Sequence, residues 1–119
     1  MKKDIKKIHD GALQAYNKGY IFLKMYRFEE CLDAYDVAEK LWEEETAMLT
    51  SQGDPEAAKQ SKISVLSTLS CKSYANYMMG RYDISLELIE KMLRKLLMIL
   101  KAFSGKVLCF ISLRDMKKL

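Results

Sequence analysis

The chain has 119 residues, of which 50% are hydrophobic and 30% charged, and its formal net charge is +4. One proline and five glycines are too few for a collagen-like or low-complexity chain, or for a β-sandwich or barrel that turns about every 8–12 residues. The hydrophobic content also excludes intrinsic disorder. We therefore predict an all-α fold with a single domain over residues 1–119.

Charge is distributed unevenly along the chain. Residues 1–50 carry eight basic and ten acidic side chains, whereas residues 51–119 carry twelve basic and six acidic ones. Eight carboxylates lie in the segment Glu29–Glu45, and eight basic residues lie from Lys91 onward. Nucleic-acid binding would need basic residues on one face with few carboxylates nearby, so no nucleic-acid partner is predicted. The two stretches are expected to be solvated helix faces or to attract each other, within the molecule or between copies.

Two helices are predicted before the first clear break in the chain. The first has apolar and small residues at every third or fourth position: Ile5, Ile8, Ala12, Ala15, Gly19 and Phe22. The second repeats this pattern: Phe28, Cys31, Tyr35, Ala38 and Trp42.

The break itself is a turn with helix signals on both sides. Gly53 is suited to end a helix, Asp54 to cap the next helix, and Pro55 to be its first residue. The helix that follows is expected to end near Gly80, and a fourth helix begins around Tyr82. A last helix is predicted over residues 102–117.

Cysteine and histidine usage points away from metal and catalytic chemistry. Cys31, Cys71 and Cys109 follow no signal-peptide pattern, so reduced thiols and a cytoplasmic location are predicted. His9 has no cysteine nearby, and neither a metal nor any other cofactor is predicted. The sequence has no phosphate-binding glycine loop, HExxH or GxSxG motif, and His9 is expected to be exposed without an orienting partner, so no enzyme is predicted.

The segment Leu96–Leu113 approaches the length of a membrane span. Lys101 and Lys106 lie near its middle, and each would cost about 2.5–3.5 kcal/mol on insertion. A buried terminal helix pair is therefore favoured over a membrane anchor.

The first pair of helices has a pattern that recurs in the second pair. The first copy comprises Gly19, Phe22, Phe28, Cys31, Tyr35 and Ala38, and the second comprises Ser73, Gly80, Tyr82, Ser85, Ile89 and Met92. These small and large residues resemble a tetratricopeptide repeat, in which small residues let two antiparallel helices approach and aromatic residues fill the space between them.

The resemblance implies a short right-handed α-solenoid of antiparallel helix pairs with a C-terminal helix. Its first repeat would span about residues 12–50, its second about 56–95, and a divergent capping or partial repeat 96–119. Phe28 and Tyr82 are 54 residues apart, against about 34 for a standard unit, so the second and third helices are expected to be unusually long. The Trp42–Glu45 run is similar to the extended helix of immunophilin-type co-chaperones.

Such domains commonly bind the acidic tails of heat-shock chaperones through a lysine and two asparagines. The corresponding positions here are Tyr16, Tyr20 and Cys71, which supply neither an ammonium nor an amide group. Binding of an acidic tail is therefore not predicted.

The resemblance places the peptide-binding groove on the first helix of each pair. Its predicted residues are Tyr16, Tyr20, Leu23, Lys24, Ser70, Tyr74, Tyr77 and Met78. Four tyrosines with leucine and methionine favour an apolar or aromatic peptide or a partner helix. The alternative is that these side chains pack on one another or on the C-terminal helix.

Two functions follow as expectations. The first is a protein–protein interaction module, an adaptor or co-chaperone-like protein with a protein or peptide partner. The alternative is a self-assembling structural repeat protein, a homodimer formed through the apolar C-terminal helix with its basic tail against the Glu29–Glu45 segment of a neighbour.

Overall fold

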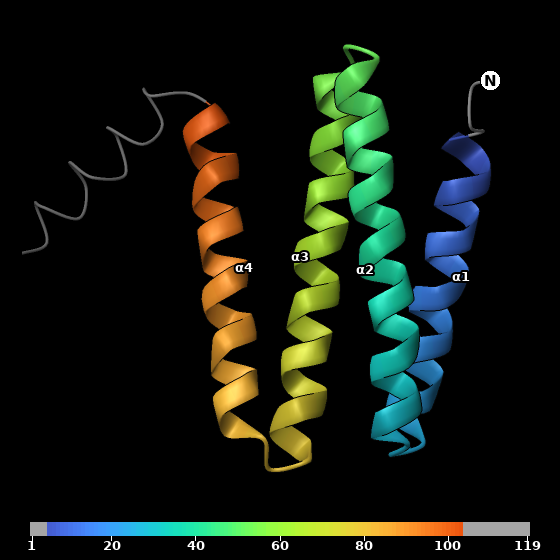
Figure 1. The fold of residues 1–119 in the computed structure, drawn as a ribbon, viewed down its shortest axis with the longest axis vertical. Helices are drawn as coiled ribbons and strands as arrows, with labels where there is room; N and C mark the ends of the chain where they lie inside the picture. The colour runs from blue at the N-terminus through green and yellow to red at the C-terminus, as the bar shows by residue number, and fades with distance from the viewer. Residues whose placement is uncertain (1–4, 104–119) are drawn as a thin grey trace, which may run out of the picture.

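The computed structural model describes residues 5–103, and all of its secondary structure there is helical. Its four helices are α1 (Ile5–Lys24), α2 (Phe28–Ser51), α3 (Pro55–Met78) and α4 (Tyr82–Phe103). They lie side by side in chain order, each antiparallel to the one before it (Figure 1). Successive helices pack against each other. The all-α prediction is confirmed, with an arrangement consistent with a small helical repeat-like solenoid.

The turns between the helices recur at equal spacing and share one geometry. Tyr26, Gly53 and Gly80 have φ values of 59°, 75° and 79°, in the left-handed region. The next residue of each turn donates its N–H to the carbonyl five residues earlier, as in Arg27 to Phe22 (2.9 Å) and Arg81 to Asn76 (2.9 Å). This is the Schellman closure of a helix end, so the same short turn reverses the chain each time.

The start of α3 confirms the predicted helix signals. Asp54 caps the helix, because its side chain accepts a hydrogen bond from the N–H of Ala57 (3.2 Å). Pro55 is the first helical residue, where its missing N–H costs nothing. The expectation of long middle helices is also met, since α2 and α3 have 24 residues each.

Small residues let the helices approach, as predicted. Gly19, Cys31 and Ala38 are all buried. A Cβ atom on Gly19 would lie 2.8 Å from the ring of Tyr35, so only glycine fits there without movement. Tyr35 itself is fully buried, and it forms the core of this end of the molecule with Cys31 and Ala75.

A second core cluster holds the other end together. It consists of Ala12 from α1, Ala38 and Trp42 from α2, and Val65 and Leu69 from α3. The two clusters thus extend through the α1–α2–α3 layer, and α4 adds Leu88 and Met92 from one side.

The helix boundaries differ from the expected repeat boundaries. α1 begins at Ile5, before residue 12, and α4 continues without a break to Phe103, beyond residue 95. The first part of the predicted partial repeat therefore belongs to α4. The rest of the predicted C-terminal helix lies outside the described residues.

Candidate functional site

Tyr16 joins the two helices that carry the predicted groove. Its hydroxyl lies 2.9 Å from the Ser67 hydroxyl and 3.6 Å from the Cys71 sulfur, both on α3. Its ring meets that of Tyr35 edge-on at 5.5 Å. Burial raises the pKa of the Tyr16 hydroxyl. Tyr16 thus provides a direct contact between α1 and α3.

The other predicted groove residues lie on these two faces. Leu23 is half-buried against the Tyr35 cluster. The rest are exposed: Tyr20, Lys24, Ser70, Tyr74, Tyr77 and Met78. We call these six residues the tyrosine surface. Tyr20 and Lys24 are four residues apart on α1. On α3, Tyr74 is four residues after Ser70 and is followed three and four residues later by Tyr77 and Met78. These spacings place the residues on one face of α1 and one face of α3.

The tyrosine surface extends to a residue that sequence reasoning used only as a repeat marker. Tyr82, at the start of α4, is exposed, and its ring lies 5.3 Å from that of Tyr77 in an edge-on contact. At the other side, the Lys24 ammonium lies 5.2 Å from the centre of the Tyr20 ring. The sequence signal for Tyr82 was its position two residues after Gly80. That position in a turn does not indicate which ring Tyr82 will contact.

A partly buried ion network around Glu39 links α2, α3 and α4. Glu39 accepts hydrogen bonds from the ammonium groups of Lys72 (2.8 Å) and Lys91 (2.9 Å). Lys72 also lies 2.6 Å from the Asp36 carboxylate. Burial disfavours the charged form of Glu39, but the two lysines outweigh it, and the pKa of Glu39 is lowered. The pKa of Lys72 is raised, because its two carboxylate partners outweigh its burial.

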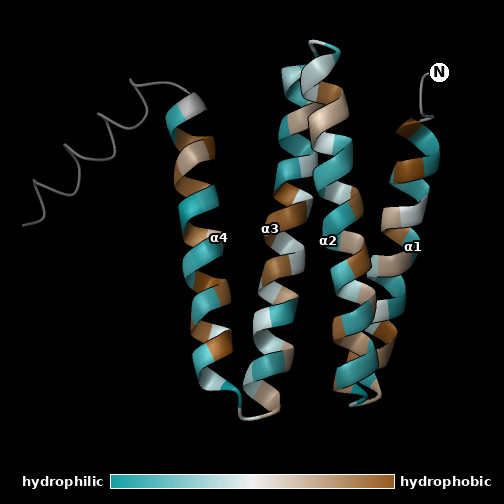
Figure 2. Cartoon of the chain, viewed as in Figure 1, coloured by the Kyte–Doolittle hydropathy of each residue, from teal (hydrophilic) through white to brown (hydrophobic). Residues whose placement is uncertain are grey.

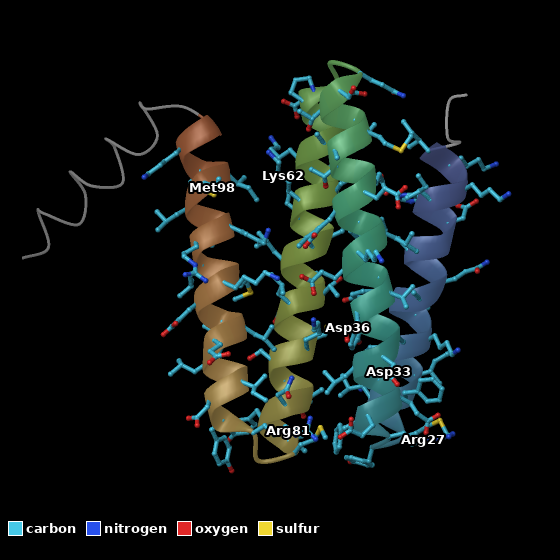
Figure 3. All side chains as sticks on the ribbon, viewed as in Figure 1. Arg27, Asp33, Asp36, Lys62, Arg81 and Met98 are labelled. Carbon is cyan, nitrogen blue, oxygen red and sulfur yellow. The ribbon has the colours of Figure 1, made fainter. Side chains whose placement is uncertain are left out.

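This network shows how part of the acidic stretch and part of the basic stretch of the sequence are placed in the fold. Most carboxylates of the acidic segment are exposed, as expected of a solvated face, but Glu39 and Glu45 are buried. The acidic and basic stretches meet within the molecule, at Glu39 and Lys91. A further pair, Arg81 to Glu29 at 2.7 Å, joins the α3–α4 turn to the start of α2 near the lower edge of the layer (Figure 3).

His9 has the orienting partner that the sequence did not indicate. Its Nδ1 lies 3.2 Å from both carboxylate oxygens of buried Glu45. Its ring meets Trp42 edge-on at 5.2 Å. His9 is exposed as expected, but the expectation that it lacks an orienting partner is wrong, because the helical start of α1 places it over α2. The Nε1 atom of Trp42 is buried without a hydrogen-bond partner.

Two adjoining clefts lie between α4 and the upper halves of α2 and α3. Their volumes are about 340 Å³ and about 240 Å³, and they share Lys62 and Ile99. Figure 3 shows Lys62 and Met98 beside the space between α3 and α4. Lys62, Lys95 and Glu43 give the smaller cleft a mixed-charge rim around Val65 and Met98. None of the predicted groove residues lines either cleft.

Two of the three cysteines lie in residues 5–103. Cys31 and Cys71 are free thiols, buried and half-buried respectively. Burial raises the pKa of Cys31 to about 11, as expected for an inert core thiol. No group of His, Cys, Asp and Glu in this part of the chain has the arrangement of a metal site. None of the four described helices has the length and apolar character needed to span a membrane.

Comparison with protein-family models, with curated proteins and with solved structures found no match to this chain.

Proposed function

We propose that this protein is an interaction module that binds an apolar or aromatic segment of a partner protein, peptide or helix, on its tyrosine surface. The observation that carries the proposal is the exposure of three tyrosines on α1 and α3, the two helices that Tyr16 connects. Tyr20, Tyr74 and Tyr77 are 48%, 51% and 56% exposed, and Met78, which follows Tyr77 on α3, is also exposed. The resemblance to tetratricopeptide repeats supports the same face.

The chemistry of tyrosine suits such a surface. A tyrosine ring supplies a large contact area with few rotatable bonds, and its hydroxyl can pair with a partner's backbone. Tyr16 holds α1 and α3 together beneath this surface through Ser67, which limits the reorganisation needed on binding.

The described charges favour an uncharged partner segment over an acidic one. Lys24 is the only cation among the six residues of the tyrosine surface, and it already faces the Tyr20 ring. The acidic-tail clamp of the co-chaperones needs a lysine and two asparagines, where this chain has Tyr16, Tyr20 and Cys71. An adaptor role is therefore proposed without that ligand class. The free thiols of Cys31 and Cys71 support a reducing, cytoplasmic setting.

The test uses a displayed library of random 16-residue peptides selected on the full chain. Selected peptides are expected to be rich in Leu, Phe and Trp, and to lose at least about tenfold in affinity when Tyr20→Ala and Tyr74→Ala are combined. Binding is measured by fluorescence polarisation, with helicity checked by circular dichroism.

The matched control is Val37→Ala, because Val37 is 52% exposed on α2 and does not belong to the tyrosine surface. This variant should bind as the wild type does. Selection of acidic peptides, or equal affinity for the double tyrosine variant, would contradict the proposal.

A further inference from the structure

The exposed side of α4 carries a continuous apolar stripe. Tyr82, Leu86, Ile89, Leu93 and Leu96 recur at alternating spacings of four and three residues, and all five are exposed. This is the a/d pattern of a helix that pairs with another helix. Figure 2 shows hydrophobic residues along the whole of α4.

The stripe is distinct from the side of α4 that packs on the rest of the molecule. Ser85 is buried, and its hydroxyl bonds to Ser73 of α3 at 2.8 Å. Leu88 and Met92 contact the core, and Lys91 reaches Glu39. Leu86 and Leu93, in contrast, are 57% and 50% exposed. An apolar face of α4 is therefore left open by α3.

The corresponding positions on α2 show what such a stripe does in this fold. The equivalent turns before α2 and α4 end at Arg27 and Arg81, which aligns Ile89 with Tyr35 and Leu96 with Trp42. Both aromatic residues are buried on α2, where Ala12 and Tyr16 of α1 and Ala75, Val65 and Leu69 of α3 pack against them. The stripe on α4 is thus a surface on which a helix would pack.

The exposed charges of α4 are divided between its two halves. Exposed Asp83, Glu87 and Glu90 lie in the N-terminal half of α4, and exposed Arg94 and Lys101 lie in its C-terminal half. Two copies of α4 side by side in opposite directions would place acidic residues next to basic ones. The same two helices in parallel would place like charges together.

We propose that α4 is a homodimer interface, in which the stripe of one copy packs antiparallel against the stripe of a second copy around a two-fold axis. Such an interface needs one surface that is complementary to itself, which the apolar stripe and the reversed charges provide. It involves α4 itself rather than a contact between the basic tail and the Glu29–Glu45 segment, and it does not depend on the proposed peptide binding.

Light scattering after size exclusion of the full chain, from low to high protein concentration, tests this interface. The wild type should have twice the monomer mass, and the combined Ile89→Glu and Leu93→Glu variant should be a monomer of unchanged helicity. Val37→Glu is the matched control, since it places the same charge at an exposed apolar position of α2 and should leave the dimer intact.

The orientation is tested by charge reversal. Arg94→Glu should weaken the dimer about threefold at low salt, because the new carboxylate, although outside the apolar seam, adds negative charge beside the acidic half of the partner helix. Adding Glu87→Lys to this variant should restore association. A wild type that stays monomeric, its stripe covered by other residues of the chain or by another protein, would overturn the proposal. So would a dimer that survives both glutamates, and an Arg94→Glu dimer of full strength would overturn the antiparallel arrangement.

Discussion

Tyr26 and Gly80 occupy the same place in two turns that close with the same hydrogen bond. The N–H of Arg27 bonds to Phe22, and that of Arg81 bonds to Asn76, each at 2.9 Å. Both residues have a positive φ, 59° at Tyr26 and 79° at Gly80. Glycine adopts this conformation without steric cost, whereas a tyrosine Cβ approaches the neighbouring carbonyl oxygen. The first turn therefore holds strain that the third does not.

Replacing Tyr26 with glycine should stabilise the protein. The left-handed conformation costs a non-glycine residue roughly 1–2 kcal/mol, and the loss of the edge-on contact with Phe28 and the added chain entropy offset part of the gain. We expect a net increase of about 0.5–1 kcal/mol in the free energy of unfolding, measured by urea denaturation.

Gly80→Ala is the control for this prediction. A Cβ at Gly80 would have no atom within 4 Å, so its effect reports the backbone conformation alone. It should destabilise the protein by about 1 kcal/mol. A stabilising Gly80→Ala, or a destabilising Tyr26→Gly, would show that the turns are not equivalent.

Gly19→Ala should be destabilising although alanine favours helices. Its Cβ would lie 2.8 Å from two carbon atoms of the Tyr35 ring, which is fully buried and has little room to move. Overpacking of this kind costs about 1–3 kcal/mol. Gly11→Ala is the matched control in the same helix, because its Cβ would meet Leu41 at an ordinary 3.4 Å. Gly11→Ala should gain about 0.5–1 kcal/mol in the same urea titration, and equal effects of the two changes would contradict the close approach.

The features that the sequence predicted correctly depend on local patterns. The turn at Gly53, Asp54 and Pro55 needs only adjacent residues, and the buried positions of Gly19 and Ala38 follow from helical spacing. The features it missed depend on partners distant in the chain. The residues around Glu39 in the sequence do not distinguish it from a solvated carboxylate, because its partners Lys72 and Lys91 are on other helices.

The candidate site shows the same division. Helical spacing places Tyr20 and Tyr74 on outer faces, and both are exposed. The same reasoning gave Tyr16 an open position, whereas its hydroxyl is engaged by Ser67 on another helix. Tyrosine is not a typical turn residue, so the sequence around Tyr26 does not indicate its left-handed conformation. The only indication is that Tyr26, Gly53 and Gly80 are equally spaced along the chain.

Glu39→Gln should destabilise the protein at neutral pH, because it leaves the Lys91 ammonium group without its carboxylate partner and leaves Lys72 with Asp36 alone. Breaking a fully buried ion pair costs about 3–5 kcal/mol, and the partial exposure of Lys91 lowers the expected loss to about 2 kcal/mol. The exposed Glu29→Gln change removes the partner of Arg81 and should cost less than about 1 kcal/mol.

The effect of Glu39→Gln should depend on pH. The pKa of Glu39 is lower in the folded protein than in the unfolded chain, so its contribution is complete above the ordinary carboxyl range and is lost as the pH falls through the folded value. The difference in unfolding free energy between the wild type and the variant should therefore shrink in acid. A difference that stays constant from neutral pH into that range would contradict the ionised state of Glu39.

Alkylation should separate the two described cysteines. Cys31 is fully buried, and burial raises its pKa to about 11, so it remains a protonated and inaccessible thiol at mildly alkaline pH. Cys71 is half-buried with its sulfur 3.6 Å from the Tyr16 hydroxyl. Iodoacetamide at pH 8 should therefore label Cys71 in the native protein and Cys31 only after denaturation in urea, as measured by mass spectrometry of the peptides. Native labelling of Cys31 at the rate of Cys71 would mean that α2 separates from α1 and α3 far more often than their packed core allows.

The raised pKa of Cys31 also gives a direction for the stability of the protein. The thiol holds its proton more tightly in the folded protein than in the unfolded chain. Its contribution to the free energy of unfolding is therefore complete below the unfolded pKa and is lost as the pH rises through about 11.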